Sequence, residues 1–125
     1  MQNTGGIMLN IQGKEIHLAC GHTDMRKSIN GLSAIVQMSF QLDPCSPAVF
    51  VFCNRKRDRL KILEWDKDGF WLYLKRLEQG HFKWPQASEK EKTMSLSYEE
   101  LTNLISGPGL EQKLRRRRLD AKIVI

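Results

Sequence analysis

Residues 48–77 read AVFVFC-NRKRD-RLKILEWD-KDG-FWLYLKRL, and this stretch decides the fold class. The run 48–53 is apolar throughout and rich in aromatic and β-branched residues, which is the pattern of a central strand. The polar residues 54–58 predict a hairpin loop, and 59–66 predicts a strand with one mixed face. The first two strands are therefore expected to form an antiparallel hairpin.

The same pattern continues toward the C-terminus. The segment Lys67-Asp68-Gly69 predicts a turn with Gly69 in a left-handed conformation, and 70–77 predicts a third strand. After a turn at 78–80, residues 81–84 predict a short strand that Pro85 ends. Short connections between successive strands favour an antiparallel meander.

An alternating segment and a turn precede this region. Residues 14–19 predict a strand with Ile16 and Leu18 on one face and His17 on the other. Cys20-Gly21-His22 then predicts a turn.

A main helix is expected between this turn and the central strand. Thr23 or Asp24 can cap it, because either side-chain oxygen can accept a hydrogen bond from a free amide of the first turn. The helix should end near residues 40–42, since Asp43 precedes Pro44 and is disfavoured in helical geometry. Apolar residues recur at helical spacing along it, namely Met25, Ile29, Leu32, Ile35, Val36 and Phe40.

The C-terminal part adds one strand and one short helix. A charged loop at 86–92 precedes a strand over 93–96. Ser97 is expected to cap a short helix, with Glu100 at the capping-box position. Its inward residues are Leu101, Leu104 and Ile105, and Gly107-Pro108-Gly109 should end it.

The expected fold is α+β, an antiparallel β-sheet meander packed on one main helix, with a short second helix and a basic C-terminal tail. The 125 residues are about one domain's worth. We expect a single domain over 1–110 and the tail over 111–125.

Composition indicates an ordinary soluble protein, because 41% of the residues are hydrophobic and 27% are charged. No apolar run is long enough to cross a membrane, and no secretory signal is visible at the N-terminus. The cysteines Cys20, Cys45 and Cys53 are odd in number and lack the spacing of a disulfide framework. Reduced thiols and a cytoplasmic location are the simplest interpretation.

Basic residues are unevenly distributed along the chain. The net charge is +6, and residues 113–122 alone carry six basic residues against one acidic residue. A second group, at 55–61, is opposed by Asp58 alone. Clustered cations favour a polyanionic partner, because each cation set against a phosphate releases a counterion. A solubilising tail and a solvated loop are the alternative.

Arg26 and Lys27 are expected in the first turn of the main helix, where the helix dipole is unfavourable for cations. Free amides and two cations together would make an anion site, and hence a phosphate contact. Alternatively, the two side chains pair with acids or point into water.

Aromatic residues follow the basic hairpin. Four aromatic residues come first, namely Trp65, Phe70, Trp71 and Tyr73, and they are followed by Lys75, Arg76, Lys83 and Trp84. Basic and aromatic side chains on one sheet could grip a phosphate backbone and stack on bases. In a small α+β domain, however, most aromatic side chains belong to the core.

The sequence gives no metal or cofactor site. His17, Cys20 and His22 lie close together, and Cys53 could join them in space, but the paired spacing of a zinc site is missing. His17 on an alternating strand needs no metal to explain it. We therefore predict neither a metal nor a cofactor.

No catalytic constellation is recognisable either. A two-metal nuclease needs carboxylates that converge at strand ends in a larger sheet. The acidic residues here fall in or near hairpin loops beside basic ones, which suits turns and surface pairs. They are Asp58, Glu64, Asp66, Asp68 and Glu78.

Three groups of residues together resemble one known family, over about residues 14–110. They are Cys20-Gly21-His22-Thr23-Asp24-Met25-Arg26-Lys27-Ser28-Ile29-Asn30-Gly31-Leu32; Val49-Phe50-Val51-Phe52-Cys53-Asn54-Arg55; and Leu60 to Asp66 with Asp68-Gly69-Phe70, Lys75 to Glu78 and Phe82 to Pro85. The combination is similar to the TnpB-type accessory protein, the second open reading frame, of the bacterial insertion-sequence family sixty-six. This family is distinct from the RNA-guided nucleases that share the TnpB label.

The resemblance implies a protein encoded beside a separate, larger transposase and needed for movement of the element. It implies no catalytic residues, because the family's motifs define none. The arginine run lies outside the resemblance, so its role depends on charge alone. Oligomeric state does not follow from the sequence.

The leading hypothesis is a non-catalytic accessory factor that binds the DNA backbone at the element ends and assembles with the transposase. Its expected phosphate contacts are Arg26, Lys27, Arg55, Lys56, Arg57, Arg59, Lys61, Arg115, Arg116, Arg117 and Arg118. The alternative is a protein-interaction module that docks on the transposase without touching DNA, through an apolar patch around Trp71 and Trp84. A cryptic nuclease is a third possibility.

Overall fold

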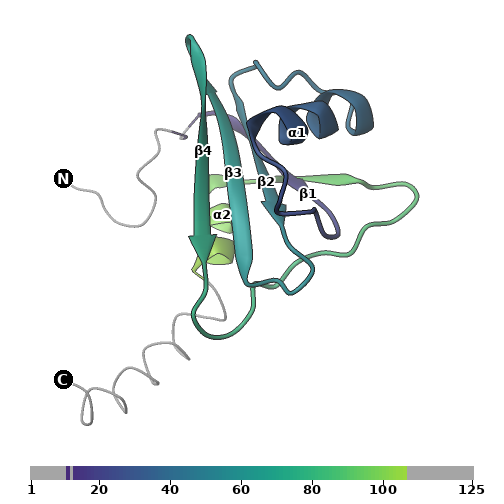
Figure 1. Ribbon diagram of the computed structural model, residues 1–125, viewed down its shortest axis with the longest axis vertical. Helices are drawn as coiled ribbons and strands as arrows, with labels where there is room; N and C mark the ends of the chain where they lie inside the picture. Colours follow the sequence, from purple (N-terminus) through teal and green to yellow (C-terminus); the bar gives the residue numbers. More distant parts are fainter. Residues whose placement is uncertain (1–10, 12, 107–125) are drawn as a thin grey trace, which may run out of the picture.

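The computed structural model describes residue 11 and residues 13–106 (Figure 1). Within this part of the chain, a five-stranded sheet is accompanied by two α-helices and one π-helical segment. In chain order these elements are β1 (Glu15–Ala19), α1 (Ile29–Ala34), the π-helix η1 (Ile35–Ser39), β2 (Ala48–Cys53), β3 (Arg59–Asp66), β4 (Gly69–Arg76), β5 (Thr93–Leu96) and α2 (Tyr98–Ile105). The fold class is α+β, as predicted.

The meander holds for β2, β3 and β4, which pair antiparallel in sequence order. The spatial order is β4-β3-β2-β1-β5, however, and β1 runs parallel to β2. The sheet is therefore mixed rather than wholly antiparallel. A parallel pair needs a crossover connection, and the segment carrying α1 and η1 provides it.

Each face of the sheet is covered by a different helix, and Figure 1 shows α1 and α2 on opposite sides. On the α1 face, Phe50, Phe52 and Leu63 pack under Leu32 and Val36. The other face is here called the α2 face, because α2 packs on it. A second core lies on this face, and the buried residues of that core include Val49, Val51, Ile62, Phe82, Trp84 and Leu101. Strand β2 is buried at all six positions, which explains its continuous apolar sequence.

The main helix starts later than its sequence pattern predicted. The first helical residue of α1 is Ile29, and residues 25–26 form a turn instead. The cause is local, because the Asp24 carboxylate accepts a hydrogen bond from the Arg26 amide at 2.9 Å. Such a side-chain turn competes with helix formation. Neither Thr23 nor Asp24 caps the helix; Ser28 stands at the N-cap without a side-chain hydrogen bond.

Two further expectations are wrong. Residues 81–84 form no strand, because Phe82 and Trp84 turn into the α2-face core and the Trp84 indole donates to the Ala19 carbonyl at 2.8 Å. In the β3–β4 turn the left-handed residue is Lys67, with φ 55°, and not Gly69.

The C-terminal helix agrees with its prediction. Ser97 Oγ accepts a hydrogen bond from the Glu100 amide at 3.0 Å, and the Ser97 amide donates to the Glu100 carboxylate at 2.8 Å. Leu101 is fully buried, and Leu104 and Ile105 pack partly against the same core. No helix in the described residues is long and apolar enough to span a membrane.

Candidate nucleic-acid interface

The hairpin loop between β2 and β3 is built around Asn54. Its side-chain oxygen accepts from the backbone amides of Asp58 and Arg59, both at 3.0 Å, and its amide group donates to the Asp58 carboxylate at 2.7 Å. This hydrogen bond is the main cause that lowers the pKa of Asp58. Arg57 adopts a left-handed conformation, with φ 59°. The loop is thus an ordered turn that presents its basic side chains.

Neighbouring segments hold this loop from two sides. The Phe82 and Leu77 amides donate to the carbonyls of Arg57 and Asp58, each at 2.7 Å. The Thr23 amide donates to the Cys53 carbonyl at 2.7 Å from the opposite side. The side chains of Arg55, Lys56 and Arg57 remain exposed. Their backbones are therefore fixed while their charged ends face solvent, as a phosphate-binding loop requires.

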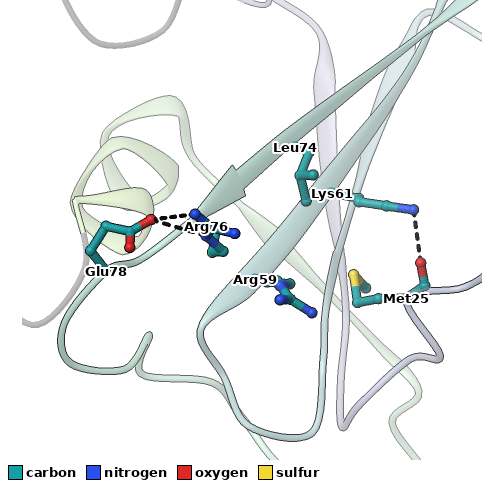
Figure 2. A pocket seen from close by; sticks show the side chains of 6 residues that line it. All are labelled: Met25, Arg59, Lys61, Leu74, Arg76 and Glu78. Atoms are coloured by element: carbon teal, nitrogen blue, oxygen red, sulfur yellow. Dashed lines mark hydrogen bonds and ion pairs between the residues drawn. The ribbon is translucent and has the colours of Figure 1, made fainter.

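Two adjoining hollows extend from the loop along the α1 face. The first, of about 470 Å³, is drawn in Figure 2 and is lined by Met25, Arg59, Lys61, Leu74, Arg76 and Glu78. The second, of about 520 Å³, shares Met25 and Arg59 with it and is lined also by His22, Thr23, Asp24, Asn54, Arg55 and Lys56. We call the two together the basic groove, since five cationic side chains line it against two acidic ones.

Two arginines meet at one end of this groove. Arg59 of β3 and Arg76 of β4 are cross-strand partners, so their side chains leave the same face of the sheet. Arg76 is paired with Glu78 at 2.9 Å. Arg59 has no side-chain hydrogen bond or ion pair within residues 13–106. Its guanidinium is thus available for an anion.

Arg76 was not among the predicted phosphate contacts. Sequence reasoning treated it only as part of a basic and aromatic run. The turn at 67–69 could have predicted its position, because this turn sets the strand register that brings Arg76 opposite Arg59.

Lys61 lies in the groove but has a structural contact. Its ammonium group donates to the carbonyls of Met25 at 2.9 Å and Lys27 at 2.8 Å, as Figure 2 shows in part. The side chain is half-buried. Lys61 therefore holds the 25–27 turn against β3 in addition to adding positive charge.

Arg26 and Lys27 differ from their predicted setting, because α1 begins after them and provides no helix N-terminus at these residues. Arg26 is paired with Asp24 at 2.7 Å. Hydrogen bonds from Arg26 are the main cause that lowers the pKa of Asp24 to about 2. Both basic side chains are exposed, beside the Met25 wall of the groove. The predicted contacts Arg115, Arg116, Arg117 and Arg118 lie outside the described residues.

The aromatic side chains divide between core and surface. Trp84 is 8% exposed, so it cannot form a surface patch with Trp71. Trp71 is 53% exposed, stacks on Tyr73 and donates its indole N–H to Asp66 at 3.1 Å. Base stacking by a row of aromatic residues therefore has little support from this arrangement.

The histidines and cysteines do not converge. His17 stacks on Phe50, with ring centres 5.5 Å apart. Burial raises the pKa of the Cys53 thiol to about 12. Among the described residues, no three His, Cys, Asp or Glu side chains are grouped as metal ligands.

These features define a small α+β domain with a basic groove between an ordered hairpin loop and the edge of its sheet. Over residues 14–115 the chain matches the family described as "IS66 Orf2 like protein", and it belongs to this family. Its role is accordingly that of an accessory protein in insertion-sequence transposition. The match extends to Arg115, beyond the boundary expected at residue 110.

Two proteins of Sinorhizobium fredii (strain NBRC 101917 / NGR234) are similar to the chain. "Uncharacterized protein y4hO" is 36% identical over 96 residues, which make up 77% of this chain and 82% of the relative. "Uncharacterized protein y4jC" is 35% identical over 96 residues, or 77% of this chain and 80% of the relative. No solved structure matches at a significant level.

Proposed function

We propose that this protein is a non-catalytic accessory factor that binds the DNA backbone at the ends of its element, in the cytoplasm, and assembles there with the separate transposase. The observation that carries the proposal is the side chain of Arg59, which lies opposite Arg76 in the basic groove and forms no hydrogen bond or ion pair within residues 13–106. Its charge acts on the neighbouring Asp58 from beyond ion-pair distance. Like charges placed directly opposite on a sheet are unfavourable, and a bound phosphate would relieve them.

The hairpin loop extends this binding surface. Arg55 and Lys56 line the same groove as Arg59, and Arg57 adjoins them in the loop. Contacts of this kind neutralise phosphates and read no bases, so binding should be largely independent of sequence and steeply dependent on salt. Arg26, Lys27 and the arginine tail would add contacts around the groove.

A fluorescence anisotropy titration tests the proposal. The full chain is titrated against the element's terminal inverted repeat and a scrambled duplex, from low to physiological salt. Arg59→Gln should weaken binding to both duplexes. It should also reduce the slope of log affinity against log salt concentration by about one. The double variant Arg55→Gln with Lys56→Gln should reduce this slope by about two. A chain ending at Gly109 measures the contribution of the tail.

Lys67→Asn is the matched control. Lys67 is exposed in the turn at the far end of β3, roughly 25 Å from Arg59, and Asn tolerates its left-handed conformation. This variant should bind as the natural chain does. If neither duplex binds, the DNA part of the proposal fails and docking on the transposase without DNA contact takes its place.

A further inference from the structure

Strand β4 forms one edge of the sheet, and no described strand lies beyond it (Figure 1). Its eight residues pair without interruption with β3, so the outward-facing N–H and C=O groups of its other edge have no ladder partner in the described chain. The opposite edge of the sheet, β5, has only four residues. Among the described strands, the longer edge without a ladder partner is therefore that of β4.

This edge lacks the usual protection against pairing. Strand β4 contains no proline, and its register with β3 shows no bulge. Its centre, residues 70–74, is uncharged. Trp71 is 53% exposed and Leu74 60% exposed, and they lie on opposite faces of the sheet. An edge that is long, regular and apolar at its centre favours the addition of another strand.

We propose that β4 pairs antiparallel with β4 of a second copy, around a two-fold axis at Leu72, to give one continuous ten-stranded sheet. In this register Leu72 faces Leu72, Trp71 faces Tyr73, and Phe70 faces Leu74 of the other copy. In each of these central pairs both residues are aromatic or aliphatic, and cross-strand pairs of this kind stabilise neighbouring strands.

Charge complementarity favours a second copy over another partner. In the same register Arg76 faces Asp68 of the other copy, once at each end of the paired strands. Asp68 is exposed, and its carboxylate has no ion pair or hydrogen bond within the described residues. Strand β4 thus supplies the apolar centre and Arg76, and the turn before it supplies Asp68. Arg76 also pairs with Glu78 of its own chain, so in the dimer its guanidinium would lie between two carboxylates.

The neighbouring two-fold registers are poorer. An axis at Tyr73 would set Trp71 against Lys75 and Phe70 against Arg76, so that charged ends cover aromatic rings. An axis at Trp71 would set Lys67 against Lys75, a like-charge pair, and Asp68 against Leu74. Only the Leu72 register keeps both the apolar centre and the opposite charges.

The dimer would also place both basic grooves on one side. A two-fold axis perpendicular to the sheet keeps the α1 face of each copy on the same side. Arg59 and Arg76 project from that face, which they share with the α1-face core. Two grooves presented together could contact one DNA molecule with higher avidity.

Charge reversal tests the pairing with the full chain and without DNA. Light scattering coupled to size-exclusion chromatography should give a dimer for the natural chain. Asp68→Arg sets arginine against arginine and Arg76→Asp sets aspartate against aspartate, so each variant should dimerise roughly tenfold more weakly. Mixing the two variants restores both opposite-charge pairs, and native mass spectrometry should detect a heterodimer that forms in preference to either homodimer.

Glu89→Arg is the matched control, an equal change of charge on an exposed loop away from β4, and it should remain dimeric. A heterodimer in the mixture also shows that both variants are folded. A monomeric natural chain, a dimer that neither reversal weakens, or a mixture that assembles no better than its components would overturn the proposal. Arg59→Gln should leave the dimer intact, which separates this result from the test of DNA binding.

Discussion

Arg59 on β3 lies directly opposite Arg76 on β4, and of the two only Arg76 forms an ion pair, with Glu78, within the described residues. Two like charges at a cross-strand position oppose folding by a few tenths of a kcal/mol. An anion bound between the two side chains would offset this repulsion. The stability and the DNA affinity of Arg59 variants should therefore change in opposite directions.

Arg59→Gln should leave the free energy of unfolding unchanged or raise it by up to about 0.5 kcal/mol, because the like-charge pair disappears. The same variant should bind DNA more weakly. Urea denaturation and anisotropy titration measure the two effects on one sample. A clear loss of stability would show that Arg59 has a structural role instead.

Lys61→Met should destabilise the fold by about 1.5–3 kcal/mol, because two backbone carbonyls lose a charged donor. The loss should appear in urea denaturation in the absence of DNA. Lys56→Gln, at an exposed loop position whose side chain forms no hydrogen bond or ion pair among the described residues, is the control and should change stability by less than about 0.5 kcal/mol. Equal stability of the two variants would argue against the structural contact of Lys61.

Gly21→Ala should lower the free energy of unfolding more than Gly13→Ala does. Both glycines have positive φ, at 77° and 86°, but a Cβ at Gly21 would lie 2.9 Å from the Ala87 Cβ, while one at Gly13 would meet nothing within 4 Å. We expect a loss of about 1 kcal/mol for Gly13→Ala from backbone strain alone, and a loss of about 2–3 kcal/mol for Gly21→Ala from strain and the close contact together. Thermal unfolding of both variants measures the difference, and equal losses would contradict the contact with Ala87.

The cysteines should react with iodoacetamide in the order of their exposure. Cys45 is exposed and should react first, whereas Cys53 is fully buried with a pKa raised to about 12. Because the unfolded thiol ionises near 9, Cys53 favours the folded state below that pH and loses this contribution as the pH rises toward 12. Mass spectrometry of alkylated peptides gives the order; early labelling of Cys53 in native protein would contradict it.

Asp24 should titrate with a pKa of about 2, chiefly because Arg26 donates hydrogen bonds to its carboxylate. The pair thus favours the folded state above pH 3.8, and this contribution is lost as the pH falls through about 2. Arg26→Gln should raise the pKa of Asp24 toward its ordinary value. Carbon-detected NMR of the carboxyl group follows this shift, and an unchanged pKa in the variant would refute the pairing.

Local pattern was enough for several elements. Three local patterns predicted their elements correctly: the apolar run of β2, the alternation of β1 and the Ser97–Glu100 capping box of α2. Each pattern was sufficient because the contacts that determine the element lie within a few residues. The basic hairpin loop was predicted for the same reason. Its rigidity was not, since it depends on hydrogen bonds from residues more than twenty positions away, at Phe82 and Thr23.

One error has a local cause and the others have non-local ones. The helical periodicity from Met25 onward suggested an early helix start, yet Asp24 folds back on Arg26 and delays it. Residues 81–84 resemble a strand because Phe82 and Trp84 alternate, although they alternate into a core and pair with no strand. Glu64 was expected among the acidic residues of turns and surface pairs, and for this residue the expectation is wrong. In the structure it is 5% exposed, forms an ion pair with Lys14 and accepts a hydrogen bond from Tyr73.

By itself, the sequence determined the α+β class, the β2–β3–β4 meander, the cap of α2 and the family, because periodicity, turn residues and motifs are properties of neighbouring positions. Only the tertiary structure decided that β1 runs parallel to β2, that Arg76 joins Arg59 in one groove, that Lys61 binds the 25–27 turn, and that β4 is the longer edge strand among the described residues. The physical reason is that each of these depends on strand register and on packing between distant segments, which no local pattern specifies.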